Sequence, residues 1–202
     1  MFRKHKQIYF YVLSFLLPII FLNLIFNLKH MYPFGSYSLL QEDLNYQYIN
    51  YLSYFRDSLL SGNIENFLYS FSMSIGSTMS GLDSYYFMNP LFIILHLFKS
   101  THILLAIYII SNLSIGLMGI SMLFYCLHSK IHRTNLFFSL VLSISYALMS
   151  YNLAYLSNLM WLTNIIMLPL ICYGVEKIIF ENKGKCFFIS LSFSILFNYY
   201  IG

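Results

Sequence analysis

The sequence is poor in charged residues, and this scarcity excludes most classes of protein. Only 9% of its 202 residues are charged, whereas 59% are hydrophobic, and the mean hydropathy is +0.69. Water does not solvate that much apolar surface, but a lipid bilayer does. The composition therefore excludes a soluble domain and predicts a polytopic membrane protein with the bilayer as its first partner.

Cysteine and metal-ligand patterns are also lacking. The chain has three cysteines, Cys126, Cys172 and Cys186, without a CxxC or Cys/His spacing. Neither a disulfide framework nor a zinc site is indicated. Asp43 and Asp83 are the acids that a metal would take, but no ligand cluster of definite spacing surrounds them, so no metal and no cofactor are predicted. The net charge of +4 comes from short basic clusters between apolar runs, so nucleic acid is not an expected partner.

Five apolar runs predict an all-α, polytopic transmembrane bundle of about five spans. The runs are Ile8–Leu28, His102–Leu127, Asn135–Ser150 (extending toward Tyr155), Met160–Ile179 and Cys186–Gly202. A helix of about 20 residues crosses the hydrocarbon core of about 30 Å, and no cleavage site follows the first run. The chain thus divides into a tail and first helix (1–28), a large loop (29–101) and further transmembrane helices (102–202).

Positive charge predicts the orientation of the helices. Eight of the 11 basic residues fall in segments 1–7, 128–134 and 176–185: Arg3, Lys4, Lys6, Lys130, Arg133, Lys177, Lys183 and Lys185. The 29–101 loop carries only Lys29, Arg56 and Lys99. By the positive-inside rule the N-terminus is cytoplasmic and the loop is extracellular, in a multi-pass protein of the cell membrane. Because the chain stops at an apolar run without a polar tail, we expect a fragment of a longer protein.

The 29–101 loop holds five of the seven acidic residues and the best candidates for polar chemistry. Apolar residues recur at helical spacing between 40 and 60, at Leu44, Tyr48, Tyr51, Leu52, Phe55 and Leu59. Polar residues recur on the opposite face, at Asp43, Gln47, Asn50, Tyr54 and Asp57. This pattern predicts an amphipathic helix on the membrane surface that ends at Gly62. The shorter run Pro90–Phe98 predicts a surface or partly embedded helix.

A small, polar stretch from Ser70 to Gly81 follows that helix. Its glycines, Gly76 and Gly81, allow a ligand to approach the backbone closely, although no phosphate-loop motif is present. Tyr85 and Tyr86 then return to the apolar zone, where they are candidates either for ligand binding or for an ordinary interfacial aromatic belt.

These residues resemble the YfhO family of bacterial membrane proteins. The resemblance rests on the order and spacing of short motifs: Leu39–Leu44 with Gln47 and Tyr48, Leu59–Asn63, Gly76 and Gly81, Tyr85-Tyr86 with Asn89-Pro90-Leu91, Trp161-Leu162 with Leu168-Pro169-Leu170, and Asn198–Gly202. The likeness spans the whole chain, which would cover only an N-terminal part of a typical member. Thr163-Asn164 departs from the pattern, since an acidic residue is expected there.

The resemblance implies a GT-C-like glycosyltransferase. Such an enzyme transfers sugar from a polyprenyl-phosphate donor to a cell-envelope polymer, such as teichoic acid, on the outer membrane face. Asp43, just after the first helix, is then the expected catalytic base. The expected substrate-binding residues are Gln47, Tyr48, Gly76, Gly81, Tyr85, Tyr86 and Asn89.

Three alternatives stay open from the sequence. Glu42-Asp43 is also suited to cap the surface helix, because anions stabilise helix N-termini. A transporter or flippase component for envelope polymers is a second possibility, but no predicted span has an acid at its centre. A non-catalytic membrane scaffold is the third, and a truncated enzyme relative that is inactive would have the same composition.

Overall fold

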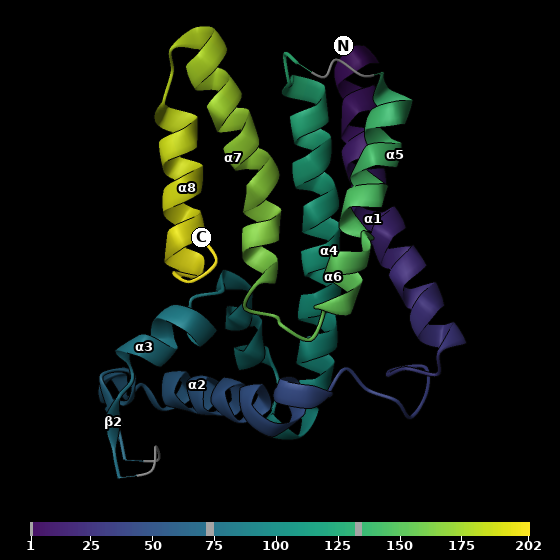
Figure 1. The fold of residues 1–202 in the computed structure, drawn as a ribbon. Helices are drawn as coiled ribbons and strands as arrows, with labels where there is room; N and C mark the ends of the chain where they lie inside the picture. Colours follow the sequence, from purple (N-terminus) through teal and green to yellow (C-terminus); the bar gives the residue numbers. More distant parts are fainter. Residues whose placement is uncertain (1, 72–74, 132–134) are drawn as a thin grey trace.

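The chain forms a helical bundle with an irregular segment laid across one end (Figure 1). The computed structural model describes residues 2–71, 75–131 and 135–202, with side chains from residue 7 onward. Arg133 and residues 72–74, used in the sequence interpretation, lie outside these ranges. The bundle helices are α1 (Phe2–Leu28), α4 (Ile103–His128), α5 (Leu136–Ala147), α6 (Ser150–Ala154), α7 (Leu162–Glu181) and α8 (Lys185–Phe197). The predicted all-α class is confirmed.

Within the residues that the structure describes, four helical stretches are long and apolar enough to cross a membrane. They are Gln7–Leu28, Ser100–His128, Leu136–Ala154 and Leu162–Glu181. The third stretch includes both α5 and α6, which agrees with the predicted extension of the run Asn135–Ser150 toward Tyr155. The last predicted span, 186–202, is shorter than expected: α8 has 13 residues, which measure about 20 Å against the about 30 Å of a hydrocarbon core. It ends because the Asn198 side chain accepts the N–H groups of Tyr200 and Ile201, at 3.1 Å each.

Helices α1 and α4 approach closely at two glycines. A Cβ atom on Gly119 would lie 2.0 Å from the Ser14 carbonyl oxygen, and one on Gly116 would lie 2.6 Å from the Phe15 ring. Pro18 has no N–H, so the Ser14 carbonyl lacks its usual helical donor. Gly119 therefore lets α4 pack directly on the carbonyl that the proline leaves free. Gly116 and Gly119 do not have the GxxxG spacing, but, like that motif, they let two helices approach each other closely.

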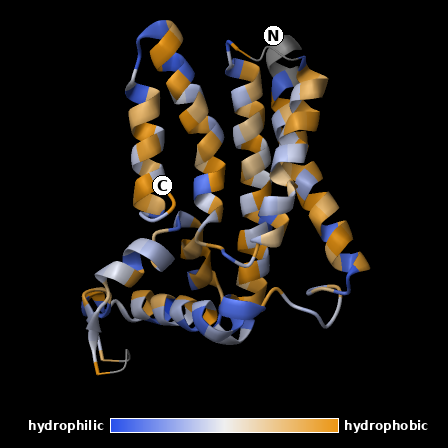
Figure 2. Ribbon diagram, in the orientation of Figure 1, coloured by the Kyte–Doolittle hydropathy of each residue, from blue (hydrophilic) through white to orange (hydrophobic). Residues whose placement is uncertain are grey.

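The 29–101 segment covers the end of the bundle where α1 ends and α4 begins (Figure 1). Its elements are η1 (Leu44–Tyr48), α2 (Ile49–Ser61), η2 (Ile64–Phe67), the hairpin strands β1 (Tyr69–Ser70) and β2 (Ser77–Thr78), α3 (Ser80–Leu82), η3 (Asp83–Phe87), η4 (Pro90–Leu97) and η5 (Ser100–His102). Hydrophobic residues run along the bundle helices, whereas hydrophilic residues gather in this segment and at the turns of the opposite end (Figure 2).

The amphipathic pattern around α2 is confirmed, but its apolar face packs against protein. Leu44, Tyr48 and Leu52 are buried in the main hydrophobic core together with Phe92 of η4 and Leu159. We expected this face to rest on lipid. Instead η4 and the α6–α7 connection fill the space beneath it, because both are themselves strongly apolar. The helix ends as predicted at Gly62, which adopts the left-handed conformation with φ of 67°.

Candidate active site

Asp43 precedes the π-helical turn η1 and carries an exposed carboxylate. The hydroxyl of Tyr48, at the end of that turn, donates a hydrogen bond of 3.1 Å to Asp43 Oδ2. A π-turn brings residues five apart onto one face, whereas an α-helix would align residues three or four apart. The local backbone therefore makes this pair, and it fixes the carboxylate beside a buried aromatic ring.

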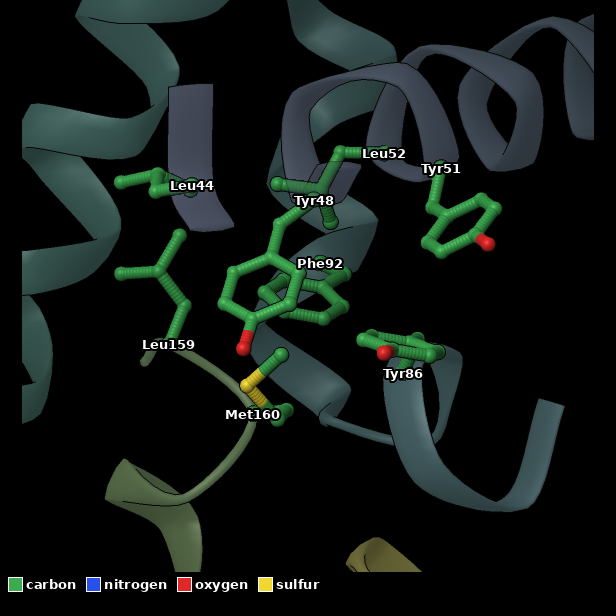
Figure 3. Close-up of a pocket in the computed structure, with 8 residues that line it drawn as sticks. All are labelled: Leu44, Tyr48, Tyr51, Leu52, Tyr86, Phe92, Leu159 and Met160. Carbon is green, nitrogen blue, oxygen red and sulfur yellow. The ribbon is translucent and has the colours of Figure 1, made fainter. Parts of the chain in front are cut away.

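Tyr48 belongs to a group of aromatic side chains that we call the tyrosine cluster: Tyr48, Tyr51, Tyr85 and Tyr86. Tyr86 is at its centre, with ring centroids 5.5 Å from Tyr48, 4.9 Å from Tyr51 and 4.6 Å from Tyr85. Figure 3 shows Tyr48, Tyr51 and Tyr86 around one small pocket that Leu44, Leu52, Phe92, Leu159 and Met160 also line. Rings from η1, α2 and η3 thus meet in one cluster, and Tyr48 joins that cluster to Asp43.

The environment keeps two of these hydroxyls protonated. Burial, followed by the hydrogen bond to Asp43 and the charge of that residue, raises the pKa of Tyr48 well above its usual range. Burial and the neighbouring Tyr85, Tyr51 and Asp43 raise the pKa of Tyr86 to about 12. At neutral pH both phenols are therefore neutral hydrogen-bond donors, and neither is suited to act as a base.

A second, shallow recess opens on the other side of the cluster. Gly81, Leu82, Tyr85, Tyr86 and Tyr200 line it. Gly81 has open space where a Cβ would stand, so its backbone is accessible from this recess. Asp43 does not line this recess, but its charge acts on Tyr86, which does. A wall of aromatic rings is suited to bind a ligand with one apolar face and several hydroxyl groups.

The C-terminal part of the chain holds this recess in place. Trp161 Nε1 donates a hydrogen bond of 3.0 Å to the Tyr85 hydroxyl, and the rings of Tyr85 and Tyr200 meet edge to face at 5.2 Å. The sequence analysis did not identify Trp161, Tyr200 or Tyr51 as site residues. For Trp161 and Tyr200 the only signal was their place in the family-like motifs, while Tyr51 stood in the apolar stripe of α2.

The remaining predicted site residues lie in different settings. Gln47 is exposed in η1, and its amide donates to the Tyr51 hydroxyl of α2 at 3.4 Å. Asn89 is buried; its amide donates to the Leu159 carbonyl at 2.8 Å and its oxygen accepts from Leu91 N at 3.0 Å. Gly76 lies in the β1–β2 hairpin with φ of 98°, against the Tyr69 ring. The structure therefore joins Asp43, Tyr48, Tyr85, Tyr86 and Gly81 around the cluster, places Gln47 beside it, and leaves Gly76 in the hairpin.

No group of three or more His, Cys, Asp or Glu side chains that would hold a metal ion occurs within residues 2–71, 75–131 and 135–202. Asp43 has the Tyr48 hydroxyl as its hydrogen-bond donor.

Comparison with protein families agrees with the motifs around this site. The family model described as bacterial membrane protein YfhO matches residues 14–202. The chain belongs to the YfhO family. No curated protein and no solved structure matches it. The YfhO match includes every residue of the tyrosine cluster as well as Asp43, Trp161 and Tyr200, so the whole candidate site lies inside the YfhO region.

Proposed function

We propose that this chain forms part of a membrane glycosyltransferase, with Asp43 as the catalytic base. The donor is a polyprenyl-phosphate-linked sugar and the acceptor is a hydroxyl group of a cell-envelope polymer such as teichoic acid. The observation that carries the proposal is the Asp43–Tyr48 pair, an accessible carboxylate oriented by a buried phenol next to an aromatic recess. This arrangement supports the GT-C-like reading of the YfhO family better than helix capping, since the Asp43 side chain makes no capping hydrogen bond to η1.

The proposed reaction needs a base and an orienting donor. The acceptor oxygen attacks the anomeric carbon, the bond from that carbon to the phosphate oxygen breaks, and polyprenyl phosphate leaves with the electron pair. The acceptor proton passes to the Asp43 carboxylate as the new bond forms. Tyr48 acts as a positioning residue, because its hydroxyl holds Oδ2 and leaves Oδ1 free for the acceptor.

The site lies at the bundle end opposite the basic turns. Lys130, Lys177 and Lys183 surround Glu181 there, at 2.9, 2.7 and 3.2 Å. If these turns face the cytoplasm, as the positive-inside rule favours, the 29–101 segment faces outward and meets a donor on the outer membrane leaflet. We propose this orientation, with the N-terminus in the cytoplasm.

A transporter role has less support. Transporters place free ionisable groups within the membrane. Here the spans contain the acids Glu176 and Glu181 only, both near the basic end. Glu176 already accepts hydrogen bonds from Tyr125 Oη, Ser129 Oγ and Lys130 N, at 2.8, 2.7 and 2.8 Å. Glu176 therefore stabilises the end of α4 and the start of the turn that follows it.

The decisive experiment compares two neighbouring carboxylates. The gene that encodes the protein is deleted, and the envelope polymer is analysed after complementation with the wild type, with Asp43→Asn and with Glu42→Gln at matched expression. We expect Asp43→Asn to lower sugar transfer about a hundredfold or more. Glu42→Gln should retain it, because Glu42 is an equally exposed carboxylate without the tyrosine donor. Full glycosylation by Asp43→Asn would return Asp43 to a structural role.

A further inference from the structure

A second acid, Asp83, borders a recess that the proposed transfer reaction does not use. The recess lies between α2, η2, η3 and η4 and is lined by Phe55, Phe67, Asp83, Phe87, Met88, Asn89, Pro90 and Ile93. It holds about 620 Å³ of free space with its open mouth included, a size common for small-molecule sites.

The Asp83 carboxyl has an unusual environment for an acid. Its Oδ1 atom is buried and has no hydrogen-bond partner among the residues that the structure describes. Burial raises the pKa of Asp83 to about 6, so the group is still largely ionised at neutral pH. The nearest basic residue in α2, Arg56, is committed to Asp57 and to the Phe98 carbonyl. A partly buried negative charge therefore stands without a cation from the described part of the chain.

Three phenylalanine rings form one part of the remaining lining. The Phe55 ring lies 5.8 Å from that of Phe67 and 5.0 Å from that of Phe87, between centroids. Aromatic faces attract organic cations, and the attraction grows when the cation is removed from water. A carboxylate combined with several phenyl rings is the usual protein solution for binding an ammonium group, because the acid supplies charge and the rings supply apolar contact.

We infer that this recess, bounded by Asp83, Phe55, Phe67 and Phe87, binds an ammonium group carried on a short organic chain. A hydroxyl ligand would find few polar partners besides Asp83, because the Asn89 side chain is already bonded to the Leu159 carbonyl and to Leu91 N. An anion would be repelled by the charge of Asp83. Ile93, in the apolar helix η4, is 64% exposed, so one rim of the recess is open and apolar. An amine-bearing lipid headgroup and a free amine on an envelope molecule share the required chemistry.

The first measurement uses the wild-type chain in a neutral detergent, with choline and ethanolamine as probes. Calorimetry compares choline with its uncharged carbon isostere, in which a tert-butyl group replaces the trimethylammonium group. We expect choline to bind at least about tenfold more tightly than the isostere, since shape and apolar area are the same and only the charge differs. Equal affinity, or no binding of either cation, would overturn the inference.

Two aspartate variants then locate the charge. Asp83→Asn should lose the preference for choline over the isostere. Asp57→Asn should keep it, because Asp57 is exposed and paired with Arg56. Thermal unfolding of Asp83→Asn checks the fold, and the comparison of the two ligands on the wild type does not depend on any variant. A preference that survives in Asp83→Asn would contradict the assignment.

Lipid nanodiscs separate the two sources of the amine. Choline binding is measured in discs of phosphatidylglycerol alone and in discs that also contain phosphatidylethanolamine. Competition by the second lipid assigns the site to a headgroup, whereas unchanged binding assigns it to a free amine. These results do not depend on glycosyl transfer, so loss of the proposed activity in Asp43→Asn leaves the ammonium site untouched.

Discussion

The Asn198 side chain donates a hydrogen bond of 3.1 Å to the backbone carbonyl of Tyr85, across 113 residues. The same side chain accepts the N–H groups of Tyr200 and Ile201. One fully buried asparagine thus ends α8 and joins it to the turn that carries two tyrosines of the candidate site. The final helix is coupled to the site through this residue.

Asn198→Ala is therefore expected to destabilise the protein. Removing the amide takes this partner from the Tyr85 carbonyl and from the Tyr200 N–H, at about 1–3 kcal/mol for each group that stays buried. The Ile201 N–H keeps the Asn198 backbone carbonyl as an acceptor, at 3.3 Å. The measurement is the thermal unfolding midpoint in detergent. Asn45→Ala is the control, because Asn45 is an exposed asparagine in η1. An unchanged midpoint in Asn198→Ala would show that water replaces these hydrogen bonds.

Gly119→Ala tests the contact between α1 and α4. The new Cβ would lie 2.0 Å from the Ser14 carbonyl oxygen, a backbone atom that cannot move without the helix. We expect a loss of about 1–3 kcal/mol in unfolding free energy, as overpacking produces. Gly184→Ala is the matched control, since nothing lies within 4 Å of its added Cβ. Equal stabilities of the two variants would contradict the close contact.

The sequence alone predicted the class of fold because its evidence is strong and local. An apolar run long enough to span a bilayer forms a helix there, because a helix satisfies the backbone hydrogen bonds of the run within lipid. Gly62 marks a helix end because glycine adopts the left-handed conformation easily. The burial of the α2 face against protein was not predictable. Periodicity shows that a face is apolar, but it does not show whether η4 or lipid covers it.

The candidate site was predictable only in part, for a related reason. Asp43 and Tyr48 are five residues apart, and helical spacing would not pair them; the π-turn does. Trp161 and Tyr200 reach Tyr85 from distant parts of the chain, and one sequence contains no signal for such pairings. Asn89 looked like a ligand residue, but its amide is held by the Leu159 carbonyl, so any ligand would have to displace that bond.

The proposed orientation predicts a specific labelling pattern in intact cells. A cysteine-free background is prepared, and single cysteines are introduced by Asn45→Cys and Lys183→Cys. Both positions are exposed. Asn45 lies in η1 of the 29–101 segment, and Lys183 lies in the turn between α7 and α8, which is at the other end of the bundle (Figure 1). We expect a membrane-impermeant maleimide to label the first and not the second until the cells are opened. The reverse pattern would place the site in the cytoplasm and exclude a donor on the outer leaflet.

Tyr48→Phe is expected to lower kcat while leaving KM nearly unchanged. The variant keeps the ring that packs under Tyr86 and removes only the hydroxyl that orients Asp43. A fall of about tenfold in kcat corresponds to one lost hydrogen bond to a charged group. Steady-state assays with a polyprenyl-phosphate-linked sugar provide the measurement. Tyr46→Phe, at a side chain that is 80% exposed, serves as the control. A change in KM alone would mean that Tyr48 binds substrate and does not position the base.

The raised pKa of the Asp83 carboxyl leads to a prediction of how the unfolding free energy depends on pH. Its folded-state pKa, about 6, lies above the ordinary value of 3.8 because burial disfavours the charged form. Such a group favours folding below the unfolded pKa, and this contribution is lost as pH rises through the folded pKa. Between pH of about 4 and about 6, the wild type should therefore lose unfolding free energy that Asp83→Asn retains. Unfolding curves collected at several pH values measure the difference. Asp57→Asn should follow the wild type, because Asp57 is exposed and paired with Arg56. Parallel pH profiles for the wild type and Asp83→Asn would show that the carboxyl of Asp83 is solvated in the folded state. Choline would pair with the Asp83 carboxylate, so at neutral pH we expect it to raise the unfolding free energy of the wild type and not that of Asp83→Asn.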